Sequence, residues 1–390
     1  MPSLGFLFLK VLRLGATAYG GPGMISQIKE TFVNKYHWVE EGDFMRGLAL
    51  CQLTPGATMV QMVTYSSYHI RGIWGAVAAG LAFVPPAFFA MLVLSAIYFK
   101  LQTLYFMQAL FKGLGAIVVA IVFNTCITFG RTILKDWKTA LISLLSFVGF
   151  FMKWNILLIF FLAAMSGLLL QPKTHPKPAS SGERSCGRLM KGKEHLVLGT
   201  LAACIVAILA ISYVVDLRLT ALFLSLSKIG ALAFGGGFTA IALIQYEMID
   251  RSHWLATKEF LDGIALGQVT PGPVLITATF VGYKISGLLG AFMATLGAFF
   301  PSFFILILLI PYHYRLGQVE KVRFMEQGVL GSFVGILALV LFNFGRASFV
   351  DIQSILIAIG AFFAIHKKIG LPYVLTVGAV VSVILFGLLK

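Results

Sequence analysis

The chain has 390 residues, of which 59% are hydrophobic and only 12% are charged, and its mean hydropathy is +0.92. A soluble domain carries about 25% charged residues, so this composition excludes a soluble globular protein and predicts that lipid is the main solvent. The formal net charge is +15. Because the basic residues lie in short connectors between apolar segments, they indicate the positive-inside rule and not nucleic-acid binding.

The apolar segments predict an all-α polytopic membrane protein with about thirteen helices and 10–13 transmembrane segments. Segments of about 14 residues are short for a span of about 20 residues, and these predict half-helices or a re-entrant hairpin. In chain order the predicted helices are 3–19, 44–67, 72–98, 109–130, 138–151, 154–170, 196–214, 220–237, 260–281, 287–312, 326–345, 352–365 and 371–389.

The two halves of the sequence match when one is shifted by 215 or 216 residues. His37-Trp38 then meets His253-Trp254, and Gln52-Leu53-Thr54-Pro55-Gly56 meets Gln268-Val269-Thr270-Pro271-Gly272. Such matches in register predict an internal duplication. The predicted parts are a first repeat at 1–170, a basic, proline-containing cytoplasmic linker at 171–195, a connecting transmembrane helix at 196–214, and a second repeat at 215–390.

The predicted helix count implies that the two repeats have opposite orientations, because an odd number of crossings separates equivalent points. With the linker placed in the cytoplasm, the cytoplasmic connectors hold more Lys and Arg than the exterior ones, which agrees with inversion. Inverted repeats with Gly/Pro-broken helices around a central site are a common plan for secondary transporters.

The main candidate site is a Thr-Pro-Gly break near the middle of one helix in each repeat. Unpaired backbone in hydrocarbon survives only inside protein or along a cavity. Thr followed by Pro predicts an N-cap and the first residue of a new helical segment. The amides of Gly56, Ala57 and Gly272 would then lack intrahelical partners and form an anion site. The candidate substrate-binding residues are Gln52, Thr54, Pro55, Gly56, Ala57, Gln268, Thr270, Pro271 and Gly272.

The breaks and the Gly-rich segments near them each have an alternative interpretation without a ligand. A proline kink in a packing helix would explain either break without a ligand. Pro273 also removes a donor that Ala57 keeps, so we expect an asymmetric pocket. A second pair of Gly-rich segments, containing Gly20-Gly21 and Gly235-Gly236, predicts either a second helix interruption or close helix packing.

Charged residues give weaker signals. The equivalent cations Arg13 and Lys228 lie within the first helix of each repeat, where they would attract a dianion or extend toward the interface. No Asp or Glu lies well inside an apolar segment, which disfavours a buried-carboxylate proton relay. Six acids lie near the first connectors: Glu30, Asp43, Glu247, Asp250, Glu259 and Asp262. We expect them to be solvated loop charges, and a gate or proton-handling role is the less favoured alternative. Scattered His and Cys predict no catalytic cluster, cofactor or metal.

The doubled motifs resemble those of the CHR family of chromate ion transporters, of the two-domain, long-chain type. The second half carries them most fully, as Phe234-Gly235-Gly236-Gly237, Trp254, and Gln268 to Pro273, whereas Ala57 departs from the second proline of the motif in the first half. The resemblance implies a multi-pass protein of the bacterial plasma membrane that exports chromate and confers chromate resistance.

The residues themselves predict only an oxyanion site in a membrane protein. Chromate and sulfate are tetrahedral dianions of similar size, so a transporter for sulfate or another oxyanion is the first alternative. An anion channel is the second, and an integral membrane enzyme is the least supported. A homodimer is left open by the sequence.

Overall fold

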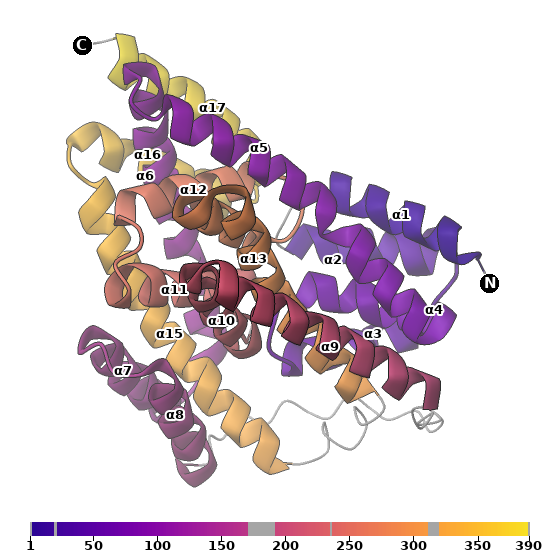
Figure 1. Ribbon diagram of the computed structural model, residues 1–390. Helices are drawn as coiled ribbons and strands as arrows, with labels where there is room; N and C mark the ends of the chain where they lie inside the picture. Colours follow the sequence, from indigo (N-terminus) through magenta and orange to yellow (C-terminus); the bar gives the residue numbers. More distant parts are fainter. Residues whose placement is uncertain (1, 19–21, 171–191, 235, 311–319, 389–390) are drawn as a thin grey trace. The chain divides into compact units, whose positions relative to one another are not determined.

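The computed structural model describes residues 2–18, 22–170, 192–234, 236–310 and 320–388, and every regular element in these ranges is helical (Figure 1). Among the described residues, five helical segments are long and apolar enough to cross a membrane: Thr58–Leu101, Tyr105–Ile133, Leu196–Val215, Val274–Leu309 and Lys321–Ser348. The chain is therefore an all-α integral membrane protein. The predicted 10–13 transmembrane segments remain a prediction, because four further apolar helices are only 10–17 residues long.

The helices follow the same order in the two halves of the chain. The first half contains α1 (Leu4–Thr17), α2 (Pro22–Lys29), a π-helical turn η1 (Glu30–Lys35), α3 (Glu41–Leu53), α4 (Thr58–Phe83), α5 (Pro85–Leu101), α6 (Tyr105–Ile133), α7 (Trp137–Phe151) and α8 (Ile156–Leu170). After α9 (Gly192–Val215), the second half contains α10 (Leu217–Leu232), α11 (Gly237–Gln245), η2 (Tyr246–Arg251), α12 (Thr257–Val269), η3 (Val274–Ile276), α13 (Thr277–Leu309), α15 (Glu320–Ser348), α16 (Ile352–His366), α17 (Leu371–Val383) and η5 (Ile384–Leu388).

Several matched helices have identical lengths. Both α3 and α12 have 13 residues, both α6 and α15 have 29, and both α7 and α16 have 15. The matched helices α7 and α16 also begin in the same way, since Asp136 accepts from the Thr139 amide at 2.8 Å and Asp351 accepts from the Ser354 amide at 2.9 Å. The element order thus agrees with the sequence shift of 215 or 216 residues.

Two matched glycines turn a helix back on itself. Gly72 in α4 and Gly287 in α13 have φ angles of +61° and +57°, which L side chains rarely adopt. The backbones on either side of each turn are in contact: a Cβ on Gly75 would lie 2.2 Å from the Ser67 carbonyl oxygen, and one on Gly282 would lie 2.2 Å from that of Gly290. The sequence places helix boundaries near these glycines, and the structure shows each boundary as a tight turn.

The described residues form two compact units, and neither unit coincides with a repeat. The first unit comprises Met1–Leu92, Pro176–Ala240 and Pro271–Val322, and the second comprises Val93–His175, Ile241–Thr270 and Arg323–Lys390. In the first unit α1 packs on α4 and α10 packs on α13; in the second, α6 packs against α12, α16 and α17. Each unit therefore draws matched helices from both repeats.

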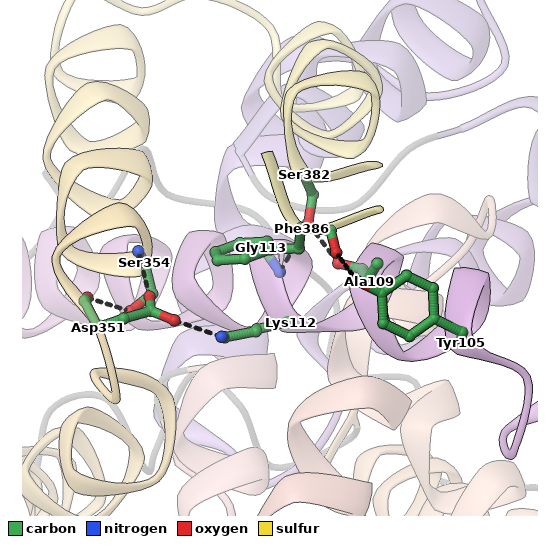
Figure 2. Close-up of polar contacts among 8 residues, drawn as sticks. All are labelled: Tyr105, Ala109, Lys112, Gly113, Asp351, Ser354, Ser382 and Phe386. Carbon is green, nitrogen blue, oxygen red and sulfur yellow. Dashed lines mark hydrogen bonds and ion pairs between the residues drawn. The ribbon is translucent and has the colours of Figure 1, made fainter. Parts of the chain in front are cut away.

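Polar contacts join α6 to its neighbours in the second unit (Figure 2). Lys112 forms an ion pair with Asp351, and Ser382 Oγ accepts from the Gly113 amide at 2.9 Å. Burial alone would raise the pKa of Asp351, but hydrogen bonds from Lys112 and Ser354 outweigh it and hold this pKa below its ordinary value. One carboxylate thereby both caps α16 and fixes α6 beside it.

Small residues set the close approach of helices in the first unit. A Cβ on Gly15 of α1 would lie 2.4 Å from the Phe83 carbonyl oxygen in α4. At the matched place, a Cβ on Gly230 of α10 would lie 2.3 Å from the Ala298 carbonyl oxygen in α13. Because these neighbours are backbone atoms, they cannot move aside as a side chain would, so glycine decides the helix spacing.

Gly15→Ala should lower the melting temperature of the purified protein in detergent, because overpacking of this kind costs about 1–3 kcal/mol. Gly5→Ala is the matched control, since it lies on the same helix with nothing within 4 Å of its Cβ. It should leave the melting temperature unchanged or slightly raised. Equal melting curves for the two variants would contradict the packing argument.

Candidate functional site

The first Thr-Pro-Gly break separates α3 from α4. Thr54 ends α3, because its amide still donates to the Leu50 carbonyl at 3.0 Å while its own backbone is extended. The N-cap of α4 is Ala57 and not Thr54. The predicted role of Thr-Pro as helix start is therefore wrong in both repeats, since Thr270 likewise ends α12 and Pro273 precedes η3. Four residues of extended or turning backbone form each break.

The break amides have no intrahelical partners, as predicted, but they are bonded to groups on distant helices and are not free for an anion. The Gly56 N–H donates to the Ala233 carbonyl, and the Gly272 N–H donates to the Ala18 carbonyl, each at 2.7 Å. Ala18 and Ala233 are the residues that end α1 and α10. Helix ends leave carbonyls without intrahelical donors, so each break satisfies the end of the first helix of the opposite repeat. All four residues belong to the first unit.

The third predicted amide, that of Ala57, also has a partner. It donates to Ser302 Oγ in α13 at 3.0 Å, and both groups are buried. The matched residues in the other repeat are Pro273, which has no N–H, and Ala87, which has no hydroxyl. The donor and the acceptor are thus both present at one junction and both missing at the other, so neither junction buries an orphaned group there. The predicted asymmetry between Ala57 and Pro273 has this structural consequence.

Glycine is required at the two breaks for conformation and for space. Gly56 and Gly272 have φ angles of +125° and +110°. A Cβ on Gly56 would lie 2.0 Å from Ser302 Oγ, and one on Gly272 would lie 2.6 Å from the Ala87 Cβ. The glycines were predicted to let a ligand approach the backbone. In the structure α13 approaches Gly56 and α5 approaches Gly272 instead.

Donors remain at the start of α4. Its first intrahelical bond runs from the Gln61 amide to the Ala57 carbonyl at 3.0 Å, so the amides of Thr58, Met59 and Val60 precede the helical ladder. Thr58 and Met59 are half-buried. At the matched place Val274, Leu275 and Ile276 of η3 are buried. The first break thus offers the more accessible helix start.

A buried polar face continues from this helix start. Gln61, Thr64 and Ser67 are each 0% exposed and follow one another at intervals of three, so they share a side of α4. Gln61 Nε2 donates to the Pro55 carbonyl at 2.7 Å. Within the described part of the chain, Gln61 Oε1, Thr64 Oγ1 and Ser67 Oγ have no hydrogen-bond partner. This polar face was not among the predicted sites, although polar residues at this spacing in an apolar helix are a readable signal.

The other predicted residues are spread over different environments, and their role in binding stays a prediction. Gln52 is exposed, whereas Gln268 is 6% exposed and its Nε2 has no partner among the described residues. Thr270 Oγ1 donates to the Gly267 carbonyl at 3.0 Å. Arg13 is exposed and Lys228 is half-buried. Pro55, Pro271 and Gly236 lie in the described breaks, and Gly20, Gly21 and Gly235 lie outside the described residues.

Two of the acids are not solvated loop charges, contrary to the prediction. Glu247 is 5% exposed and Asp262 is 4% exposed, because η2 and α12 place them inside the second unit. The Tyr98 hydroxyl, itself in a side chain that is 4% exposed, donates to Asp262 Oδ2 at 2.7 Å. This burial was not predicted because both acids lie in short polar segments between apolar ones, which is typical of exposed connectors.

Comparison with known proteins identifies the family. The family model described as "Chromate transporter" matches residues 6–168 and 220–383, which are most of the chain. The chain belongs to the chromate transporter family. The two matched segments lie within the predicted repeats, 1–170 and 215–390, whose boundaries remain a prediction.

Curated relatives of this chromate transporter family member match over nearly their whole length. The chain is 32% identical to an uncharacterised transporter of Methanocaldococcus jannaschii, over 98% of this chain and 94% of the relative. It is 27% identical to a chromate transport protein of Cupriavidus metallidurans, over 98% and 93%. It is also 27% identical to a chromate transport protein of Pseudomonas aeruginosa, over 92% and 85%. No solved structure matches the chain.

Ser302→Ala should lower the melting temperature, because the buried Ala57 amide then loses its acceptor at a cost of about 1–3 kcal/mol. Ala57→Pro should fit the backbone, since Ala57 has a φ angle of −75°, and it removes the donor. The double variant, Ala57→Pro with Ser302→Ala, gives the first junction the residues of the second.

These three variants form a double-mutant cycle read by melting temperature in detergent. We expect the double variant to be more stable than Ser302→Ala alone, because the orphaned donor is gone. If the two losses simply add, the hydrogen bond between Ala57 and Ser302 contributes nothing to the fold.

Proposed function

We propose that this protein transports chromate across the membrane. The observation that carries the proposal is family membership over nearly the full length, including relatives named as chromate transport proteins in three organisms at 27–28% identity. The helices described above supply the membrane-spanning scaffold. We further propose that transport is export from the cytoplasm, that it confers chromate resistance, and that the protein resides in the plasma membrane with residues 171–195 in the cytoplasm.

The proposed substrate site is the first break together with the polar face of α4. A dianion needs several hydrogen-bond donors at once when it leaves water. The amides of Thr58, Met59 and Val60 can supply donors at the positive end of a helix dipole. The Thr64 and Ser67 hydroxyls, which have no partner among the described residues, can supply further donors as the anion moves along α4. The predicted residues Gln52, Thr54 and Pro55 border this site.

The proposed transport cycle uses two inverted repeats. Its support is the reciprocal pair of bonds from Gly56 to Ala233 and from Gly272 to Ala18, a pattern that a two-fold relation between repeats generates. Broken helices at a repeat interface are the usual place for substrate in secondary transporters. Exposing the site to alternate sides then requires one set of repeat contacts to loosen while its counterpart holds.

Thr64→Val should reduce the initial rate of chromate uptake into inverted vesicles about tenfold, which corresponds to losing one hydrogen bond to a charged group. The substitution preserves side-chain shape and removes a hydroxyl that has no partner in the described part of the chain. It should therefore not lower the amount or stability of folded protein.

Ser66→Ala is the matched control for this experiment. Ser66 is also 0% exposed and without a partner at its hydroxyl among the described residues, but it lies on another side of α4 because it is two residues on. It should transport like the native protein. Equal uptake by Thr64→Val and the native protein would remove the polar face of α4 as the substrate site.

The same vesicles separate the competing functions. Saturating uptake that excess sulfate leaves unchanged supports a chromate transporter, and inhibition by sulfate indicates a broader oxyanion transporter. Flux that never saturates and cannot run against a gradient would instead indicate an anion channel.

A further inference from the structure

The second unit holds a buried carboxyl group beside open cavities. Asp262 lies on α12 and lines a cavity of about 140 Å³ together with Tyr98 and Glu259. It also lines a neighbouring cavity of about 280 Å³, whose wall includes Lys112 and Lys258. Its side chain is nevertheless 4% exposed. The carboxyl group is thus largely removed from water while water-sized space borders it on two sides.

The charged and titratable groups around Asp262 come from several elements. Tyr98 on α5 donates its hydrogen bond at 2.7 Å, and Lys258 and Glu259 lie one turn earlier on α12. Lys112 on α6 lines the second cavity, but it is ion-paired with Asp351, as Figure 2 shows. α15 and the residues that follow it contribute Ala347, Ser348 and Val350 to this cavity, none of which is charged.

None of the described cations forms an ion pair with Asp262 in this arrangement. The cation nearest in sequence, Lys258, is exposed, and Lys112 is paired elsewhere. Glu259 differs from Asp262, because it is half-buried and its Oε2 accepts from the Ala256 amide at 3.2 Å. Glu259 therefore caps α12, whereas Asp262 caps no helix and accepts from Tyr98 of α5. Burial penalises the charged form of a carboxyl group that has no cation partner.

At the matched position in the first repeat, the charge is neutralised by an ion pair. A shift of 216 residues places Arg46 opposite Asp262 and Asp43 opposite Glu259. Arg46 and Asp43 form an ion pair on α3, so the charge there is neutralised within one helix. The second repeat lacks that ion pair, and Asp262 accepts a hydrogen bond from the Tyr98 phenol in its place.

We propose that Asp262 is a proton-binding site whose occupancy is coupled to oxyanion transport. The coupling part of the proposal rests on the proposed transport function. In each cycle the ionised carboxylate takes one proton from water in the adjoining cavity and becomes the neutral acid, and release of that proton restores the carboxylate. The Tyr98 hydroxyl donates to the ionised form and accommodates the neutral form by rotating its proton. No other reactant is needed.

The proton site is tested first without any transport assay. Infrared difference spectra of the purified full-length protein in lipid, recorded as the pH is lowered, should show a protonated-carboxyl C=O component that is missing from Asp262→Asn, while the components of the other carboxyl groups persist. Glu259→Gln is the matched control, since Gln can still cap the helix, and it should keep this component. Tyr98→Phe should keep this component with its pH midpoint raised, because the ionised carboxylate has lost its donor. Persistence of this component in Asp262→Asn would overturn the proposal.

Coupling is tested in proteoliposomes with radiolabelled chromate. An imposed pH gradient should change the initial uptake rate of the native protein and of Glu259→Gln, and it should have no effect on Asp262→Asn. Chromate/chromate exchange without a gradient should stay within about twofold of native in Asp262→Asn, because Asn keeps the shape and can accept the Tyr98 hydrogen bond. If Asp262→Asn retained the response to the pH gradient, the proposed coupling would be refuted.

The two proposals fail in different ways. Absence of chromate transport by the native protein would refute the proposed function, while the infrared component would still decide whether Asp262 binds a proton. Loss of both exchange and gradient response in Asp262→Asn, with the protein still folded, would make the residue structural and would overturn the coupling proposal.

Discussion

The first unit depends on a reciprocal exchange of two backbone hydrogen bonds, from Gly56 to Ala233 and from Gly272 to Ala18. A broken helix in an apolar environment must satisfy the groups that the break exposes. Here each break supplies the donor that the end of the other repeat's first helix requires. The positive φ angles at both glycines, the close approach of α13 to the first break, and the packing of α1 and α10 on their partners all serve this exchange.

The two junctions share this exchange of backbone hydrogen bonds, but they differ in the polar contacts next to it. Ala57 and Ser302 form a hydrogen bond where Pro273 and Ala87 have none. Beyond the junction, α4 buries polar groups that have no partner within the described ranges, whereas at the matched start of the second repeat Thr277 Oγ1 donates to the Val274 carbonyl. Unsatisfied buried polar atoms are costly, and the oxyanion proposed to bind here would supply partners for them.

The second unit contains one charged pair that stabilises the fold and one buried acid that has no cation partner among the described residues. Lys112 and Asp351 neutralise each other and join α6 to α16, so this pair is accounted for by the fold. Asp262 has a phenol as its hydrogen-bond partner and open space beside it, so its burial is not explained by packing alone. The proposed oxyanion site and the proposed proton site therefore occupy different compact units, and each unit contains helices from both halves of the chain.

The sequence by itself determined the all-helical membrane class, the internal match of the two halves and the positions of the helix breaks. These properties depend on local composition and on Gly and Pro in register, which can be read along the chain. Only the tertiary structure decided that the Gly56, Ala57 and Gly272 amides are occupied and that Glu247 and Asp262 are buried. The reason is that a hydrogen-bond partner or a desolvating neighbour comes from segments far away in the sequence, and hydropathy describes only the segment itself.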